Sequence, residues 1–175
     1  MVRLFFSLIT VMLLTSASCK KELHKLSMAK TPYTGNELKM DGYYYSNPYP
    51  GNVIGIAVLY RNGVCVHMRT EIKSQDTTGF IKNEILLNNG LMSRLWSTPT
   101  DIGVFQINNR SVKLESWVAG RDITTFSHFG EIVNDTTFLI TNWNNNDTGK
   151  SYQVNQVYRF KQFSQKPDST NNFIK

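Results

Sequence analysis

Recognised catalytic motifs are missing from this sequence of 175 residues. It has no Gly-x-Ser-x-Gly turn for a serine nucleophile, no phosphate-binding loop and no dinucleotide-binding fingerprint. Four acidic residues lie near the ends of expected strands, but nothing selects a pair of them for glycoside hydrolysis: Asp101, Glu115, Asp122 and Glu131. An enzyme acting on glycans of the cell envelope therefore stands only as an alternative hypothesis.

Clustered metal ligands and basic runs are also missing. The three histidines, His24, His67 and His128, are far apart and have no Cys or His partner at short spacing, so we expect isolated strand or surface histidines and no metal site or cofactor. The 19 Lys and Arg residues are scattered rather than gathered in a basic helix or an arginine run. This distribution argues against nucleic acid as a partner.

The chain opens on an apolar run that is too short to span a membrane. Leu4 to Leu14 reaches only about 17 Å as a helix, against a hydrocarbon core of about 30 Å. Arg3 precedes the run and small residues follow it up to Ser18. This order is typical of a secretory signal peptide, so we expect residues 1–18 to be removed. The remaining length and composition, 41% hydrophobic and 18% charged overall, are typical of one globular domain.

The segment Leu14-Thr15-Ser16-Ala17-Ser18-Cys19 resembles the lipobox of bacterial lipoproteins, in the relaxed form seen in Bacteroidetes-type members. It has Ser16 where leucine is common. The resemblance implies cleavage before Cys19, a lipid on its thiol and anchoring to the outer membrane. Lys20 and Lys21 precede a single acidic residue, so a periplasmic face is expected at least as much as surface display. Ordinary cleavage, which gives a soluble periplasmic protein, is the alternative.

The expected domain lies between two polar ends. Residues 19–39 lack periodicity and predict a lipid-anchored flexible tether, residues 40–163 a β domain, and residues 164–175 a frayed tail. Cys65 alternates within Val64–Met68, which predicts a small buried residue of a strand. Two triplets, Asp76-Thr77-Thr78 and Asp135-Thr136-Thr137, resemble acceptors for O-linked sugars in exported Bacteroidetes-type proteins.

Alternating apolar runs separated by turn residues predict an antiparallel meander that forms a barrel or a sandwich. Asn62-Gly63 favours a tight hairpin turn, Gly130 a bulge, and the spacing within 79–96 one or two short helices. The expected strands are 41–45, 53–60, 64–72, 103–107, 111–119, 123–133, 136–143 and 151–163.

This pattern resembles the lipocalin-like barrels of small bacterial lipoproteins. The matching pieces are Gly42-Tyr43-Tyr44, Gly103–Ile107 and Phe129–Phe138, with Tyr44 where a lipocalin usually has tryptophan. The resemblance implies a closed barrel of about eight strands. Such a barrel is either filled by side chains or holds one small ligand.

Candidate ligand-binding residues come from the aromatic side chains and the last strand. They are Tyr44, Trp117, Gln156 and Tyr158. Gln156 lies on an apolar face and needs a hydrogen-bond partner there, either a ligand or a side chain. The expected occupant is a small apolar ligand, a glycan or an envelope partner, with core packing as the plainer interpretation of the aromatic residues. A structural subunit that associates through Val53–Leu59 is a further alternative, and the oligomeric state is left open.

Overall fold

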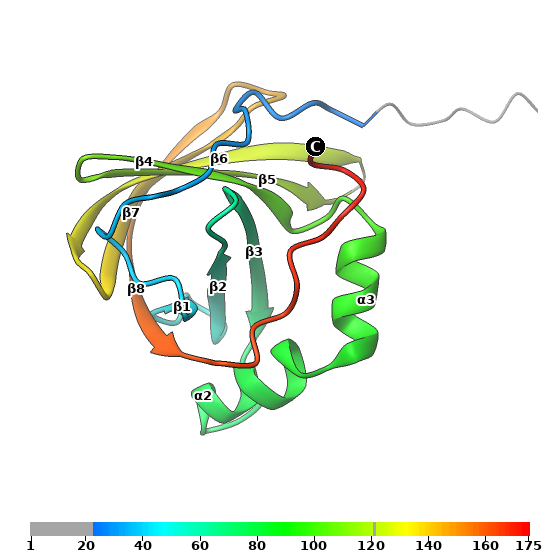
Figure 1. The fold of residues 1–175 in the computed structure, drawn as a ribbon, viewed down its shortest axis with the longest axis vertical. Coiled ribbons are helices and arrows are strands. Elements are labelled where there is room, and N and C mark those ends of the chain that lie inside the picture. Colours follow the sequence, from blue (N-terminus) through cyan, green and yellow to red (C-terminus); the bar gives the residue numbers. More distant parts are fainter. Residues whose placement is uncertain (1–22, 121) are drawn as a thin grey trace, which may run out of the picture.

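The computed structural model describes residues 23–120 and 122–175, and its strands form a closed barrel (Figure 1). Each strand pairs antiparallel with the next in sequence order, and β8 pairs with β1 to close the barrel. The strands are β1 (Gly42–Ser46), β2 (Val53–Leu59), β3 (Val64–Glu71), β4 (Ile102–Asn108), β5 (Ser111–Ala119), β6 (Ile123–Asn134), β7 (Thr137–Asn145) and β8 (Ser151–Gln162). The expected signal peptide and Cys19 lie outside the described residues.

The lipocalin-like barrel of eight antiparallel strands is confirmed, and every strand boundary lies within two residues of its expected place. Gly63 has a φ of 86°, which a side chain rarely adopts, in the turn between β2 and β3. Gly130 lies at a shift of register between β6 and β7. A Cβ atom there would lie 2.0 Å from the carbonyl oxygen of Leu139, so the close approach of the strands requires glycine.

Helices connect β3 to β4 across the outside of the barrel (Figure 1). They are α2 (Thr77–Phe80), the π-helical segment η1 (Ile81–Leu86) and α3 (Asn89–Ser97). The side chain of Asp76 caps α2 by accepting from the Gly79 amide at 2.9 Å, and Asn88 caps α3 by accepting from the Leu91 amide at 3.0 Å. The short helices expected within 79–96 are therefore confirmed.

Two apolar clusters lie on opposite faces of the barrel wall. The outward side chains of β2, such as Ile54 and Ile56, pack with residues of η1 and α3, while the inward Ala57 and Leu59 join the cluster inside the barrel. Val53–Leu59 was proposed above as an exposed face for assembly. That hypothesis is wrong, because the helices and the C-terminal segment cover the outward face of this strand and Ile54 through Leu59 are buried.

One end of the barrel, called here the closed end, is filled. Leu59, Phe105 and Phe138 lie fully buried inside it. The segment that precedes β1 packs against the same cluster, with Leu38 1% exposed and the Tyr33 amide donating to the carbonyl of Arg61 at 2.8 Å. The closed end therefore consists of side chains from the strands and of a segment outside them.

The expected boundaries of the domain need correction. Residues 23–39 were expected to be a flexible tether, yet Tyr33 and Leu38 are buried. Residues 164–175 were expected to fray, yet Ile174 is buried in the outer cluster and the Lys166 ammonium donates to the carbonyl of Met40 at 2.7 Å. The sequence did not indicate that these two segments pack against the barrel. Both segments are extended and place isolated apolar residues into gaps, so their sequences show no periodic pattern.

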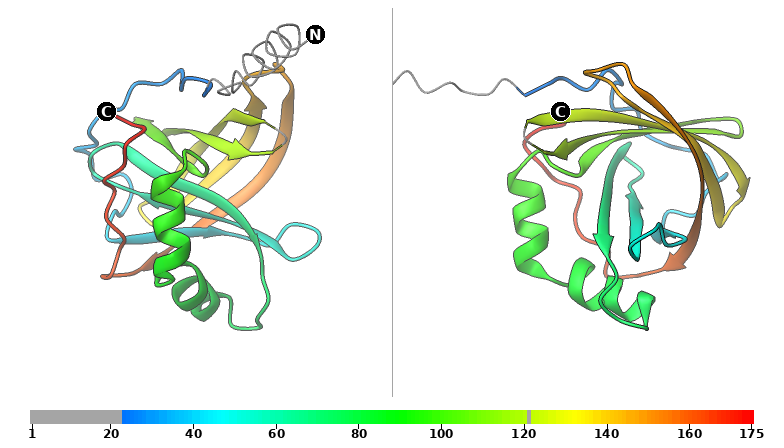
Figure 2. Two further views of the ribbon diagram at one scale, coloured as in Figure 1. Left: turned by 90° about the vertical axis from the view of Figure 1, so that its right-hand side faces the viewer. Right: turned by 180° about the vertical axis from the view of Figure 1, so that it is seen from behind.

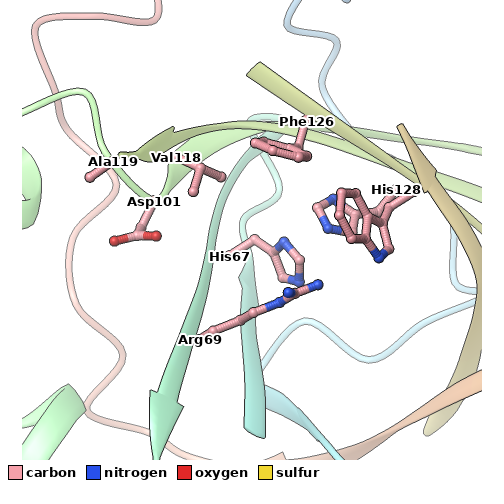
Figure 3. A pocket seen from close by; sticks show the side chains of 8 residues that line it. His67, Arg69, Asp101, Val118, Ala119, Phe126 and His128 are labelled. Atoms are coloured by element: carbon pink, nitrogen blue, oxygen red, sulfur yellow. The ribbon is translucent and has the colours of Figure 1, made fainter. Parts of the chain in front are cut away.

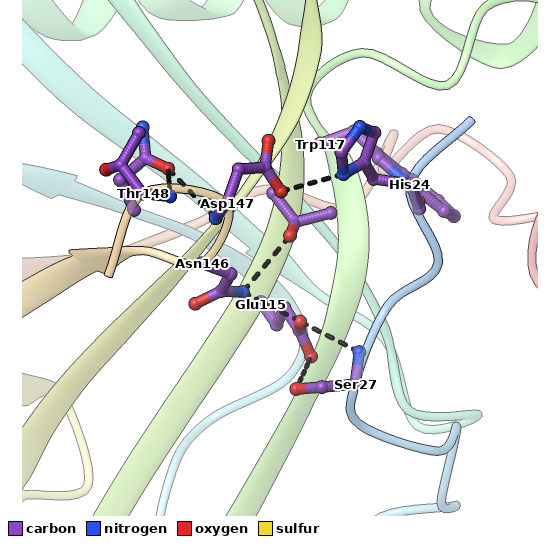
Figure 4. A network of polar contacts seen from close by, with 9 residues as sticks. His24, Ser27, Glu115, Trp117, Asn146, Asp147 and Thr148 are labelled. Atoms are coloured by element: carbon purple, nitrogen blue, oxygen red, sulfur yellow. Dashed lines mark hydrogen bonds and ion pairs between the residues drawn. The ribbon is translucent and has the colours of Figure 1, made fainter. Parts of the chain in front are cut away.

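A buried carboxylate fixes the start of the described chain to the barrel (Figure 4). Residues 23–28, called here the N-terminal strap, cross the outer face of β5. Glu115 of β5, 0% exposed, accepts from the Ser27 amide at 2.9 Å, the Ser27 hydroxyl at 3.0 Å and the Met28 amide at 2.7 Å. The Asn146 amide group donates to the same carboxylate at 2.9 Å. Hydrogen bonds to a charged acceptor are the stronger kind.

Substituting Glu115→Gln is expected to release the N-terminal strap. The amide replaces one acceptor oxygen with a donor, which leaves buried N–H groups unpaired, and should lower the free energy of unfolding by about 2 kcal/mol. Hydrogen exchange at the Ser27 and Met28 amides, together with urea denaturation, checks this. Glu131→Gln, at an exposed position of β6, is the matched control and should change neither measurement. Equal protection of the two amides in both variants would contradict the role of Glu115.

Candidate functional site

The other end of the barrel, called here the open end, holds a cavity of about 330 Å³ (Figure 3). Its polar lining consists of His67, Arg69, Asp101 and His128. Its apolar lining consists of Val118, Ala119, Phe126 and Trp143. These residues come from β3, β5, β6, β7 and the turn before β4, so closure of the barrel is what brings them together.

A pair of histidines forms the floor of the cavity. The rings of His67 from β3 and His128 from β6 meet edge to face, with centroids 4.3 Å apart. The Tyr158 hydroxyl from β8 lies 2.9 Å from Nε2 of His67, and the Tyr158 ring stacks on Phe138 at 4.8 Å. The floor is therefore the boundary between the polar open end and the apolar closed end.

The prediction of isolated histidines is wrong. His67 and His128 touch inside the barrel, and Nδ1 of the exposed His24 lies 2.9 Å from a carboxylate oxygen of Asp147. Residues far apart in sequence become neighbours here because strands of a closed barrel face one another across its interior. Within the described part of the chain, no group of three or more His, Cys, Asp or Glu side chains is placed to hold a metal ion.

Both histidines of the floor are neutral near pH 7. Burial and, to a smaller extent, the nearby Arg69 cation together lower the pKa of His67 to about 3. Burial, followed by His67 and Arg69, holds the pKa of His128 well below its usual value. A neutral imidazole offers one donor and one acceptor. Nδ1 of His128 is buried without a hydrogen-bond partner among the described residues, although such atoms are usually paired.

The walls and mouth of the cavity are aromatic. Phe126 and Trp143 have ring centroids 5.3 Å apart, and Trp143 stacks on Tyr152 at 4.1 Å. The exposed Arg69 guanidinium lies 5.5 Å from the centre of the Trp143 ring and 5.0 Å from that of Tyr49. These distances are within the range of cation–π contacts. The mouth thus combines flat apolar surfaces with one positive charge.

Asp101 contributes a carboxyl group whose protonation changes in the mildly acidic range. Burial raises its pKa to about 6, and the Arg94 cation partly offsets that rise. It is the one carboxylate among the described residues that line the cavity. Glu115 instead binds the N-terminal strap on the outer face, and Glu131 is exposed. The four carboxylates considered for glycoside hydrolysis are therefore not gathered in this cavity.

Two of the four candidate ligand-binding residues lie inside the barrel near its middle. Tyr158 belongs to the floor described above. Gln156 donates to the hydroxyl of Ser46 at 3.2 Å, so its expected partner is a side chain. The Ser46 hydroxyl also accepts from the Gly55 amide at 2.8 Å.

The other two candidates are structural in this arrangement. Tyr44 packs against Phe138 at the closed end, with its hydroxyl donating to the carbonyl of Lys39 at 3.0 Å. Trp117 faces outward, and its indole N–H donates to the carbonyl of His24 at 2.5 Å. Neither side chain lines the cavity.

Sequence reasoning missed His67, Arg69 and His128 as residues of the cavity. The sequence carried one signal for two of these residues: alternation places His67 and Arg69 on the same face of β3 as Cys65. Cys65 itself is fully buried and unpaired, which confirms its prediction as a small buried strand residue. His128 of β6 and Trp143 of β7 reach the cavity because the barrel closes. The sequence pattern alone does not place these two strands around the barrel.

The two threonine triplets lie in connections between elements. Asp76 is the N-cap of α2, and the Thr78 hydroxyl donates to its carboxylate at 3.1 Å. The second triplet begins in the turn between β6 and β7, where the Thr136 hydroxyl donates to the side chain of Asn134 at 2.9 Å. Modification of either triplet by a sugar stays a prediction.

Comparisons with known proteins gave no relative: no family model, no curated protein and no solved structure matches this chain. Among the described residues, no helix combines the length and apolar character needed to cross a bilayer.

Stability should fall as the pH is lowered from 7.5 to 4.5. Unfolding returns His67 from a pKa of about 3 to about 6.5, so the unfolded chain binds more protons in this range and acid favours it. His128 acts in the same direction, whereas Asp101 opposes both because its folded pKa is raised. His67→Gln should remove about 2 kcal/mol of the acid-induced loss, as measured by urea denaturation at both pH values.

Asp101→Asn is a control that should change the pH dependence of stability in the opposite direction from His67→Gln. It removes the group whose protonation favours the folded state in acid, so its loss of stability between pH 7.5 and 4.5 should exceed that of the wild type. The same pH dependence in all three proteins would show that these buried groups do not titrate as described.

Proposed function

We propose that this chain is a small-molecule-binding barrel of the bacterial cell envelope, held at the outer membrane by a lipid on Cys19. The observation that carries the binding function is the cavity at the open end, about 330 Å³ within a barrel that is otherwise filled. The ring of His128 lines the floor of this cavity and offers a hydrogen-bonding group beside its apolar walls, which supports the proposal. The cavity volume is near the lower end of the usual range for ligand pockets.

The lining favours an amphipathic ligand, whereas the sequence left open a small apolar ligand, a glycan or an envelope partner. Val118, Phe126 and Trp143 offer apolar surface to the body of the molecule. The floor favours an uncharged hydroxyl or carbonyl group, because its two histidines are neutral and the Arg69 cation of the lining is exposed at the mouth. The ligand class is therefore a small neutral molecule with one apolar end and one hydrogen-bonding end.

The lipobox-like segment supports the proposed anchor, and so does the burial of the second cysteine, Cys65. Two or three acyl chains on Cys19 suffice for stable membrane attachment, whereas one chain binds only marginally. Cys65 is sealed in the barrel wall, and burial raises the pKa of its thiol, so it does not compete for modification. A periplasmic orientation is at least as consistent with Lys20 and Lys21 as surface display.

Metabolic labelling with a palmitate analogue tests the anchor. Cys19→Ala should abolish the label and move the protein from the membrane to the soluble fraction, because the thiol that accepts the lipid is gone. Cys65→Ala is the matched control and should keep full labelling. Equal labelling of the wild type and Cys19→Ala would overturn the lipid anchor.

Titration with 1-octanol by calorimetry tests the cavity. Val118→Trp should weaken binding by about tenfold or more, because the larger side chain occupies the space of the ligand. Val133→Trp is the matched control at a position of β6 that is 54% exposed, and it should bind like the wild type. Circular dichroism of both variants checks the fold, and Ala119→Trp provides a second substitution at the mouth.

Binding of 1-octanol that is unaffected in folded Val118→Trp and Ala119→Trp would place the ligand elsewhere. An absence of binding by the wild type at concentrations near the solubility of 1-octanol would contradict the proposed ligand class.

A further inference from the structure

The N-terminal strap is fixed beside the cavity rather than at the closed end. Nδ1 of His24 lies 2.9 Å from Asp147, and Asn146 donates to Glu115, which also binds Ser27 (Figure 4). Asn146 and Asp147 belong to the loop between β7 and β8. This loop follows Asn145, which pairs with the cavity residue Phe126. The strap therefore meets the barrel at the rim of the open end.

The views of the fold agree with these contacts. In Figure 2, left, the loops β1–β2 and β7–β8 project on the same side of the barrel, and the described chain enters next to the β7–β8 loop. Trp143 of the cavity lining lies two residues before the end of β7, where the β7–β8 loop begins. The N-terminal strap therefore contacts the barrel at the same end as the cavity.

The distance from Cys19 to this rim is limited by the chain. Four residues lie between Cys19 and His24, so even a fully extended chain spans at most about 18 Å from one to the other. By comparison, the twelve residues of β6 extend over about 40 Å. A lipid on Cys19 would therefore hold the rim of the open end close to the membrane and leave the closed end farther away.

The surface at this rim has the composition of a membrane interface. Tyr152 is 42% exposed and stacks on Trp143, and the Arg69 guanidinium lies over both Trp143 and Tyr49. Tyr and Trp favour the level of the lipid head groups, where one part of the ring is apolar and another is polar. A cation beside them attracts phosphate groups. This observation is independent of the strap.

We propose that the open end of the barrel faces the membrane surface, with Trp143, Tyr152 and Arg69 at the level of the head groups. The inference rests on the proposed lipid on Cys19. Its consequence is that the ligand enters the cavity directly from the phospholipid bilayer and does not cross bulk water. The partner of this surface is thus a bilayer.

Tryptophan quenching in vesicles tests the orientation. The lipidated full chain is reconstituted in phosphatidylcholine vesicles that contain a lipid with a nitroxide on its head group. Trp143 lies at the open end, whereas Trp96 of α3 contacts Tyr60, next to the closed end, with ring centroids 6.2 Å apart. Trp143→Phe should lose at least about half of the quenching of the wild type, and Trp96→Phe should keep it.

A second pair of variants does not depend on tryptophan. Thr148→Cys places a thiol in the β7–β8 loop, and Val133→Cys places one near the closed end. A fluorescent label reacts at these exposed positions because Cys65 is buried and Cys19 carries its lipid. The label at position 148 should be quenched at least about twofold more strongly than the label at position 133.

The outcomes separate this inference from the proposed function. Protein that floats with the vesicles but shows equal quenching at both ends overturns the orientation and leaves the anchor standing. Protein that does not float overturns the anchor and, with it, the orientation. Binding of 1-octanol in detergent is measured apart from both, so its result bears on the cavity alone.

Discussion

The hydrogen bond between Tyr158 and His67 is the contact on which the division of the barrel depends. On one side of it, the Tyr158 ring stacks on Phe138 and continues the apolar packing of the closed end. On the other side, His67 meets His128 and the cavity begins. The hydroxyl is polar while the ring is apolar, so a single residue satisfies both halves. A barrel of this size is filled or has room for one small ligand, and this one is filled by side chains in one half and has a cavity in the other.

The buried polar groups serve different purposes at different places. Glu115 is fully satisfied and holds the N-terminal strap on the outer face. Gln156 is satisfied by Ser46 inside the barrel. Nδ1 of His128, by contrast, is buried without a partner among the described residues, and the ring that carries it lines the cavity. An unpaired buried polar atom costs about 1–3 kcal/mol, so the floor of the cavity carries a cost that the sites of Glu115 and Gln156 do not.

The sequence predicted the strands well because their side chains alternate and their turns contain Asn-Gly, Asn-Asp and similar pairs. It also predicted Cys65 correctly, since alternation alone determines which way that side chain points. It could not predict the contact between His67 and His128, which depends on closure of the barrel. The N-terminal strap was missed for another reason: its partner, Glu115, looks like any strand carboxylate until the packing of Ser27 and Met28 is known.

The imidazole nitrogen signals of His128 test most directly the proposal that a ligand's polar group binds the histidine floor. In ¹⁵N-labelled protein at pH 7, addition of 1-octanol should shift these signals, because the ring of His128 lines the cavity. The signals of the exposed His24 should stay unchanged. Unchanged imidazole nitrogen signals of His128 at saturating 1-octanol would contradict the proposal.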